Sequence, residues 1–181
     1  METIKCIKER RSIRKFKEEK VEKNVINEIV SAASFAPSWK NTQTARYTIV
    51  ENKEIKNRIA EEGVLGFTYN QKTISGAPQL VVVTYVEKRS GFERDGSYST
   101  SKGDRWENFD AGIAAQTFCL AAHDKGVGTV ILGIFDDEKV GSIIDVPENQ
   151  KVAALIAMGY PEGDTPSAPK RKSTEEILRF I

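Results

Sequence analysis

Residues 10–16 read RRSIRKF, and this basic stretch is the feature around which we interpret the rest of the chain. Arginine presents a planar fork of N–H donors that can bind a phosphate group through two hydrogen bonds at once. Ser12 adds a hydroxyl between the arginines, while Ile13 and Phe16 are apolar groups that would hold the stretch against the fold. The stretch has two interpretations, an anion clamp for phosphate and a solvated basic turn between two helices. Taken alone it favours the turn, because short basic runs are common.

A second stretch, APSWKNTQ at residues 36–43, follows a helical pattern and precedes a strand-like one. Its proline opens a loop whose Ser, Asn, Thr and Gln side chains present donors and acceptors, as the binding of a polar heterocycle requires. With both stretches together, the chain resembles the nitroreductase family of FMN-dependent NAD(P)H oxidoreductases. In that family Arg-Arg-Ser-x-Arg-x-Phe is followed about one helix later by Pro-Ser-x-x-Asn-x-Gln. The resemblance extends over nearly the whole chain.

The bulk composition argues against several classes of protein. A length of 181 residues is typical of one domain, here residues 1–181. The 27 basic and 26 acidic residues nearly balance, which argues against a nucleic-acid partner. Cys6 and Cys119 lie far apart in no paired motif, which fits a reducing compartment. The N-terminus shows no apolar signal core and the apolar runs are strand-sized, so we expect a cytoplasmic protein without a membrane partner.

Hydrophobic periodicity predicts an alternation of helices and strands. Helices are expected at residues 3–9, 21–34, 53–62, 106–125 and 136–144, with a last helix that starts at Ser173. Strands are expected at residues 46–51, 80–86, 129–134 and 152–158. Residues 63–78 lack a clear pattern and are open to interpretation as a surface loop. Residues 87–104 are polar and predict a mobile loop, either a lid or an ordinary connection.

This order of elements indicates an α+β sandwich, in which a central, mostly antiparallel sheet is flanked by helices. A doubly wound parallel sheet is the alternative fold. The helix at 106–125 is apolar over more than one face, which is typical of a long buried helix. The resemblance implies that this helix packs in a homodimer interface and that the C-terminal segment reaches the partner subunit.

Two further patterns exclude other kinds of site. His123 is the only histidine and has no companion at metal-ligand spacing, so we expect no metal. The sequence GVG at 126–128 is not a dinucleotide-binding loop, because the third glycine would fall at Ile131 and no strand precedes it.

The C-terminal stretch PKRKSTEE at residues 169–176 combines a basic cluster with a helix start. Ser173 and Glu176 have the spacing of a capping box, and cations just ahead of a helix N-terminus form a good anion site. The resemblance implies that two residues of this cluster contact the FMN phosphate, and which two they are stays open.

The resemblance implies FMN as the cofactor and NADH or NADPH as the electron donor. The two basic clusters would hold the 5′-phosphate and nearby ribityl or ring oxygens, while the second stretch would line the isoalloxazine of the partner subunit. Asn70 would reach the flavin, and a backbone N–H at Leu132 or Gly133 would point at N5. A surface loop at Asn70 and a glycine bulge at Gly133 are the alternatives. The implied cofactor-binding residues are Arg10, Arg11, Ser12, Arg14, Pro37, Ser38, Asn41, Gln43, Asn70, Leu132, Gly133, Lys170, Arg171 and Lys172.

The expected activity is the transfer of a hydride from NAD(P)H to the flavin, and then reduction of a small electron-poor acceptor such as a nitroaromatic or quinone, by a ping-pong mechanism. No side chain is expected to act as an acid or base. The alternatives are a flavin carrier or sensor without NAD(P)H turnover, a phosphate-anchored module without flavin, and a family relative that catalyses dehydrogenation or dehalogenation. Trp39, and Thr44 directly after Gln43, depart from the pattern of many relatives and bear on the shape of the pocket. The natural acceptor and the choice between NADH and NADPH are left open.

Overall fold

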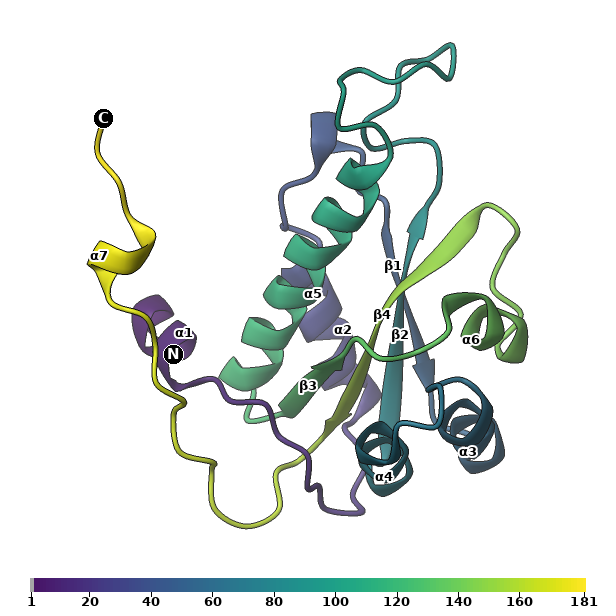
Figure 1. Ribbon diagram of the computed structural model, residues 1–181. Helices are drawn as coiled ribbons and strands as arrows, with labels where there is room; N and C mark the ends of the chain where they lie inside the picture. Colours follow the sequence, from purple (N-terminus) through teal and green to yellow (C-terminus); the bar gives the residue numbers. More distant parts are fainter. Residues whose placement is uncertain (1) are drawn as a thin grey trace.

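The computed structural model describes residues 2–181 (Figure 1). The helices are α1 (Thr3–Glu9), α2 (Lys23–Ala33), the 3-10 helix η1 (Trp39–Asn41), α3 (Lys53–Glu62), α4 (Thr68–Gly76), α5 (Arg105–Asp124), α6 (Asp137–Ile143) and α7 (Thr174–Ile177). The strands are β1 (Ala45–Val50), β2 (Gln79–Val86), β3 (Gly128–Leu132) and β4 (Gln150–Gly159). The order of elements is the one expected from the sequence, with α4 and the short η1 as additions.

The four strands form one sheet in the order β1-β2-β4-β3, and every neighbouring pair is antiparallel. Helices α2 and α5 cover one face of this sheet, while α3, α4 and α6 cover the other (Figure 1). The expected α+β sandwich is therefore confirmed, and the parallel alternative is wrong.

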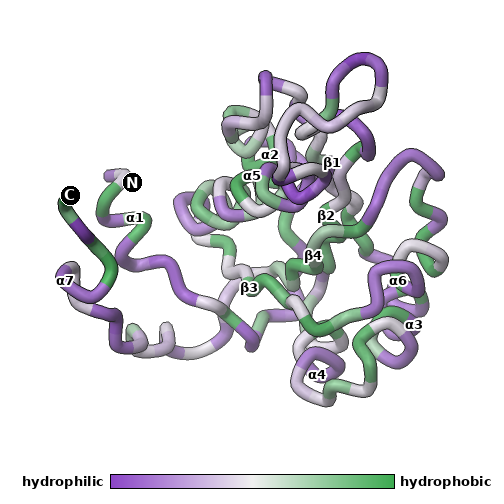
Figure 2. The backbone as a smooth tube through the Cα atoms, turned by 45° about the horizontal axis from the view of Figure 1, so that its top comes forward, coloured by the Kyte–Doolittle hydropathy of each residue, from purple (hydrophilic) through white to green (hydrophobic). Residues whose placement is uncertain are grey.

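The sequence of β2 shows why the fold has three layers. Leu80 and Val82 pack among residues of α3, α4 and α6, whereas Val81 and Val83 pack among residues of α2 and α5. All four side chains are 0% exposed, because alternate residues of a strand point to opposite faces and both faces are covered. Burial of each contributes about 1.5–3 kcal/mol relative to exposure. Figure 2 shows the same concentration of hydrophobic residues in the central strands.

Helix α5 buries one long face in this chain and leaves another uncovered. Phe118 and Cys119 pack against the sheet, with alanines before and after them on the same face. On the outer side Phe109 is 50% exposed, and Gly112 and Gln116 are exposed too. The sequence predicted that α5 is buried on several sides, but a single chain buries only one side of it.

The interpretation of residues 63–78 as a surface loop was wrong, because they contain α4. The helix was missed because its buried positions are mostly polar, with Asn70 and Thr73 beside Ile74, while Tyr69 is 73% exposed. Strand β3 ends at Leu132, so Gly133 follows the strand and the glycine-bulge alternative is wrong as well.

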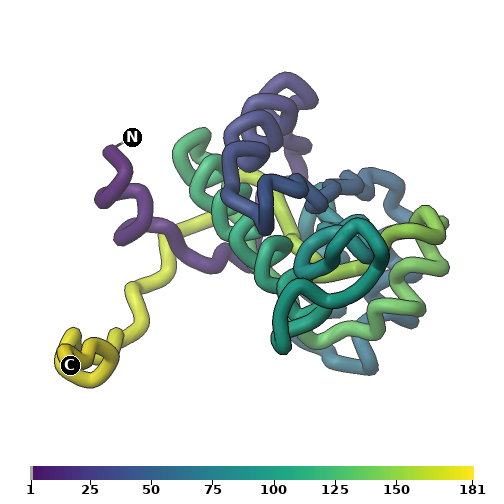
Figure 3. The backbone as a smooth tube through the Cα atoms, turned by 90° about the horizontal axis from the view of Figure 1, so that it is seen from above, coloured from purple at the N-terminus to yellow at the C-terminus, as the bar shows by residue number. Residues whose placement is uncertain are grey.

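Residues 162–181 are exposed along their whole length, and Figures 1 and 3 show this tail leaving the body of the protein and ending beyond α7. The predicted capping box is present, with Ser173 and Glu176 each bonding to the other's backbone. Helix α7 is short, and the tail leaves Ile177 72% and Phe180 88% exposed. Among residues 2–181 no helix is long and apolar enough to cross a membrane.

Candidate functional site

The basic stretch lies in an extended conformation along the edge of the sheet. Ser12 forms a parallel bridge with Thr129 of β3, and the backbone N–H of Ile13 donates to the Thr129 carbonyl oxygen at 3.0 Å. Gly128 permits this approach, because a Cβ there would lie 2.9 Å from the Ile13 side chain. Ile13 and Phe16 are buried, as predicted, and anchor the stretch in the core.

This anchoring distributes the polar residues of the stretch over two neighbouring cavities. One, of about 230 Å³, is lined in part by Arg10, Arg11 and Thr129. The other, of about 330 Å³, is lined in part by Ser12 and Arg14. Cations of the stretch therefore border both cavities.

Two residues that line the first cavity each have a buried nitrogen atom without a protein partner. Within residues 2–181, Nε of Arg11 and Nε2 of His123 are buried and make no hydrogen bond. The other end of Arg11 is engaged, because Nη1 donates to the carbonyl oxygens of Lys8 at 2.7 Å and Arg10 at 3.0 Å. Burial lowers the pKa of His123, and the nearby positive charge of Arg10 lowers it further. The positive charges of Arg10 and Arg11 in its wall make this cavity suitable for an anionic ligand.

A second group of implied residues lies past the other end of β3. Asn70 on α4 is 7% exposed, and its Nδ2 donates to the carbonyl oxygen of Ile134 at 2.9 Å. This bond ties α4 to the segment that follows Leu132 and Gly133. The basic stretch, the end of β3 and Asn70 are thus assembled by one chain along one edge of the sheet.

The C-terminal basic cluster is not assembled with that edge in the chain described. Lys170, Arg171 and Lys172 are exposed, and Figures 1 and 3 place their segment in the tail, away from the sheet.

The loop at residues 37–43 lies near the start of α5. The backbone N–H of Trp39 donates to Oδ2 of Asp110 at 2.8 Å, and the N–H of Gln43 donates to Oγ of Ser38 at 2.9 Å. A cavity of about 50 Å³ opens beside it, lined in part by Pro37, Ser38 and Gln43. Asn41 is exposed.

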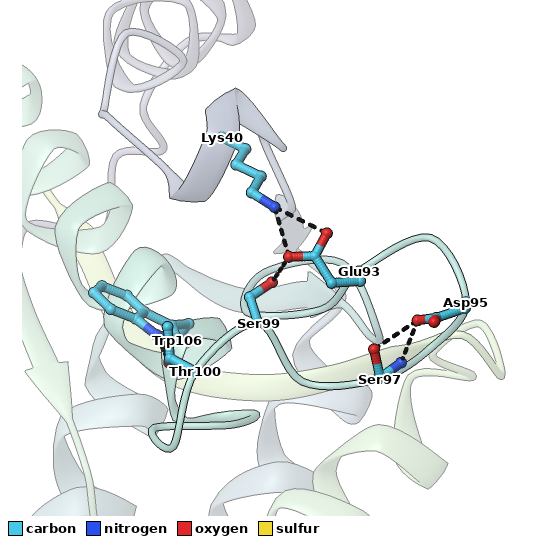
Figure 4. A network of polar contacts seen from close by, with 7 residues as sticks. All are labelled: Lys40, Glu93, Asp95, Ser97, Ser99, Thr100 and Trp106. Carbon is cyan, nitrogen blue, oxygen red and sulfur yellow. Dashed lines mark hydrogen bonds and ion pairs between the residues drawn. The ribbon is translucent and has the colours of Figure 1, made fainter.

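Polar contacts connect this loop to the segment at residues 87–104 (Figure 4). Nζ of Lys40 binds both carboxylate oxygens of Glu93, at 2.9 and 3.1 Å, and Oγ of Ser99 donates to Glu93 at 2.5 Å. The rings of Phe92 and Tyr98 lie 4.9 Å apart and pack against each other within the segment.

The 37–43 loop and the basic stretch are at opposite ends of α5. Asp110 holds the loop near the first turns of the helix, and His123 borders the Arg10 cavity in its last turn. An α-helix rises about 1.5 Å per residue, so Asp110 and His123 are separated by roughly 20 Å along α5. One chain therefore does not bring the two motifs together.

Asp110 is the residue of this region that sequence reasoning missed. Its signal was a charged residue one turn before Ala114 in a largely apolar helix, where a carboxylate is costly unless it has partners.

Comparison with known proteins places the chain among flavoenzyme relatives. The profile of the nitroreductase family matches residues 7–64 and 62–160. The chain belongs to the nitroreductase family.

An Archaeoglobus fulgidus protein named as a candidate NADH dehydrogenase/NAD(P)H nitroreductase is 29% identical, over 98% of this chain and 97% of that protein. Iodotyrosine deiodinase of Thermotoga neapolitana is 25% identical, over 96% of this chain and 94% of the relative. The structure of an FMN-dependent nitroreductase from Clostridium difficile R20291 superimposes with a TM-score of 0.77 at 26% identity, covering 98% of each chain. The family thus includes members named for different reactions. Among residues 2–181, no group of three or more His, Cys, Asp or Glu side chains is placed to hold a metal ion.

Proposed function

We propose that this member of the nitroreductase family is an FMN-dependent oxidoreductase that takes a hydride from NAD(P)H and reduces electron-poor acceptors such as nitroaromatics or quinones. The single observation that carries the proposal is the cavity beside β3 that Arg10 and Arg11 line, next to the cavity that Ser12 and Arg14 line. A single-domain organisation and a cytoplasmic location stay predictions from the sequence.

The residues around this cavity fit the phosphate end of FMN. Arg10 and Arg11 line it and supply the positive charge that a phosphate group requires. Ser12 and Arg14 border the adjoining cavity, where Arg14 would bind the phosphate and Ser12 the nearby ribityl oxygens. The C-terminal cluster would complete the phosphate site when the tail packs against the Arg10 cavity, in the same chain or in a partner subunit.

When bound, FMN would supply the chemistry of hydride transfer, and the protein would supply binding, orientation and electrostatics. A cation of the basic clusters near the pyrimidine end of the ring would stabilise the negative charge that develops there. The backbone beside Gly133 would approach the ring closely because no Cβ intervenes. Asn70, fixed by its bond to Ile134, would present its remaining polar atoms to the ring edge.

We propose that the active form is a homodimer. The 37–43 loop and the basic stretch lie at opposite ends of α5, and the resemblance assigns the loop to the flavin of the partner. The exposed side of α5 around Phe109 and the apolar end of the tail offer surfaces that a second subunit would cover.

Reductive dehalogenation is a second candidate, favoured by the likeness to iodotyrosine deiodinase over almost the whole length of both chains. It would use the same cofactor site and differ in the substrate that lies over the ring.

Anaerobic reduction of the FMN-loaded protein tests the proposal. NADH or NADPH should bleach the flavin, and a nitroaromatic or quinone should restore its colour, with parallel double-reciprocal lines in steady-state assays. An iodinated phenol in the same panel tests the second candidate. Bound flavin that neither nicotinamide reduces would indicate a carrier or sensor, and failure of FMN to bind would refute the site.

A further inference from the structure

We propose that Asp110 is a positioning residue, which fixes the 37–43 loop in the shape it presents to the flavin of the partner subunit. The effect on FMN binding rests on the proposed function. The restraint of the 37–43 loop by Asp110 is a property of the single chain.

The loop has a backbone that needs outside support. Lys40, Asn41 and Gln43 have φ angles of 43°, 54° and 49°, all in the left-handed region. Asparagine tolerates this region, whereas lysine and glutamine pay a steric penalty there. Such a conformation persists only where the surrounding structure imposes it.

Asp110 provides that support from the middle of a hydrogen-bonded network. Its Oδ2 accepts from the Trp39 backbone N–H at 2.8 Å and from Oγ of Ser90 at 2.5 Å. The hydroxyls of Ser90 and Thr42 lie 2.9 Å apart, so both ends of η1 are connected to the same carboxylate.

The burial of this network makes its bonds strong. Asp110 is 4% exposed and Ser90 is 0% exposed. Bonds to an ionised acceptor are stronger than neutral ones, and water competes little for them at a buried position. An apolar residue at this position would be enough for the packing of α5. The carboxylate is therefore explained by its hydrogen bonds to the loop. That loop leaves Asn41 and Gln43 exposed and available to a ligand.

The FMN-free protein offers a direct reporter. The rings of Trp39 and Trp106 lie 4.7 Å apart with a 44° tilt, and they are the only tryptophans in the chain. Such a pair gives an exciton-coupled circular dichroism signal that depends on the position of the loop. Asp110→Ala should abolish this signal, and Asp110→Asn should keep part of it, because a carboxamide oxygen still accepts from both donors.

Glu107→Ala is the matched control. Glu107 lies on the same helix and is also 4% exposed. It accepts from the backbone N–H groups of Lys88 and Arg89, and none of its hydrogen bonds among residues 2–181 goes to residues 37–43. It should lower thermal stability while leaving the tryptophan signal in place. Ser90→Ala removes the connection to Thr42 but leaves the bond between Trp39 and Asp110, so it should weaken the signal in part. This variant and Asp110→Asn carry the test if Asp110→Ala does not fold.

FMN titration then tests the consequence. Asp110→Ala should weaken FMN binding roughly tenfold, Asp110→Asn less, and Glu107→Ala little. If the wild type does not bind FMN, the proposed function is wrong, and the tryptophan signal still decides the restraint. If the wild type binds FMN while the folded Asp110 and Ser90 variants keep both the signal and the affinity, the inference is overturned.

Discussion

Arg11 and Arg14 belong to the same basic stretch but have different surroundings in the folded chain. Nη1 of Arg11 donates to two backbone carbonyls, which fixes the side chain in the wall of the cavity. Arg14 is exposed and makes one long contact of 3.4 Å to the Ser12 carbonyl oxygen. Most donors of Arg14 are therefore available to a ligand, and this residue is the better one in which to test phosphate binding.

Arg14→Ala should weaken FMN binding by about 1–3 kcal/mol, since it removes a charge-assisted hydrogen bond. Riboflavin, which lacks the phosphate, should lose much less affinity. Calorimetric titration with both ligands measures the difference. Lys17 is an exposed basic residue nearby, and Lys17→Ala should change neither the affinity for FMN nor that for riboflavin. Equal losses for the two ligands would assign Arg14 to the flavin ring or to the fold.

His123 should make the stability of the FMN-free protein depend on pH. Burial and Arg10 lower its pKa in the folded chain, so the unfolded chain binds more protons once the pH falls below about 6.5. The wild type should therefore lose stability relative to His123→Gln between about pH 7 and pH 5, and the difference should be constant above that window. Urea unfolding across this range measures it. If the wild type and the His123→Gln variant show the same dependence of stability on pH, the pKa of His123 is not lowered by folding.

Among the helices and strands, those with a strong hydrophobic pattern were predicted from the sequence. The apolar run of β2 and the long apolar pattern of α5 were both confirmed. Helix α4 was not predicted, because the buried side of a polar helix carries no hydrophobic period. The conformation of the 37–43 loop could not be predicted either, because the carboxylate that holds it belongs to Asp110, far along the chain. Local sequence does not report a restraint that only tertiary structure creates.

Removal of the C-terminal element tests the basic cluster. A chain that stops after Pro169 lacks residues 170–172 and α7, while the sheet and α5 remain. We expect this variant to be purified largely without FMN and to melt at a lower temperature, because cationic partners and exposed apolar side chains such as Phe180 are lost. Added FMN should restore part of the stability, at higher concentration than for the full chain. Full FMN occupancy after extensive dialysis would show that the cluster is not a cofactor ligand.

At the scale of the whole molecule, the separation of the two motifs is the central observation. One end of α5 holds the basic stretch with its cavity, and the other holds the 37–43 loop, roughly 20 Å away along the helix. The family resemblance and the uncovered side of α5 both point to a second copy of the chain. In a symmetric dimer each flavin would then have the basic stretch of one subunit and the loop of the other.

Mixing two defective variants tests this shared site most directly. One variant carries Arg10→Ala and Arg14→Ala, and the other carries Asn41→Gly and Gln43→Gly, since glycine keeps the positive φ angles without strain. Each variant alone should bind FMN poorly. After subunit exchange in equal amounts, half of the dimers are mixed and each has one intact site, so about a quarter of all sites should regain tight FMN binding. If the mixture binds no more FMN than the separate variants, the two motifs serve the same subunit and the shared site is wrong.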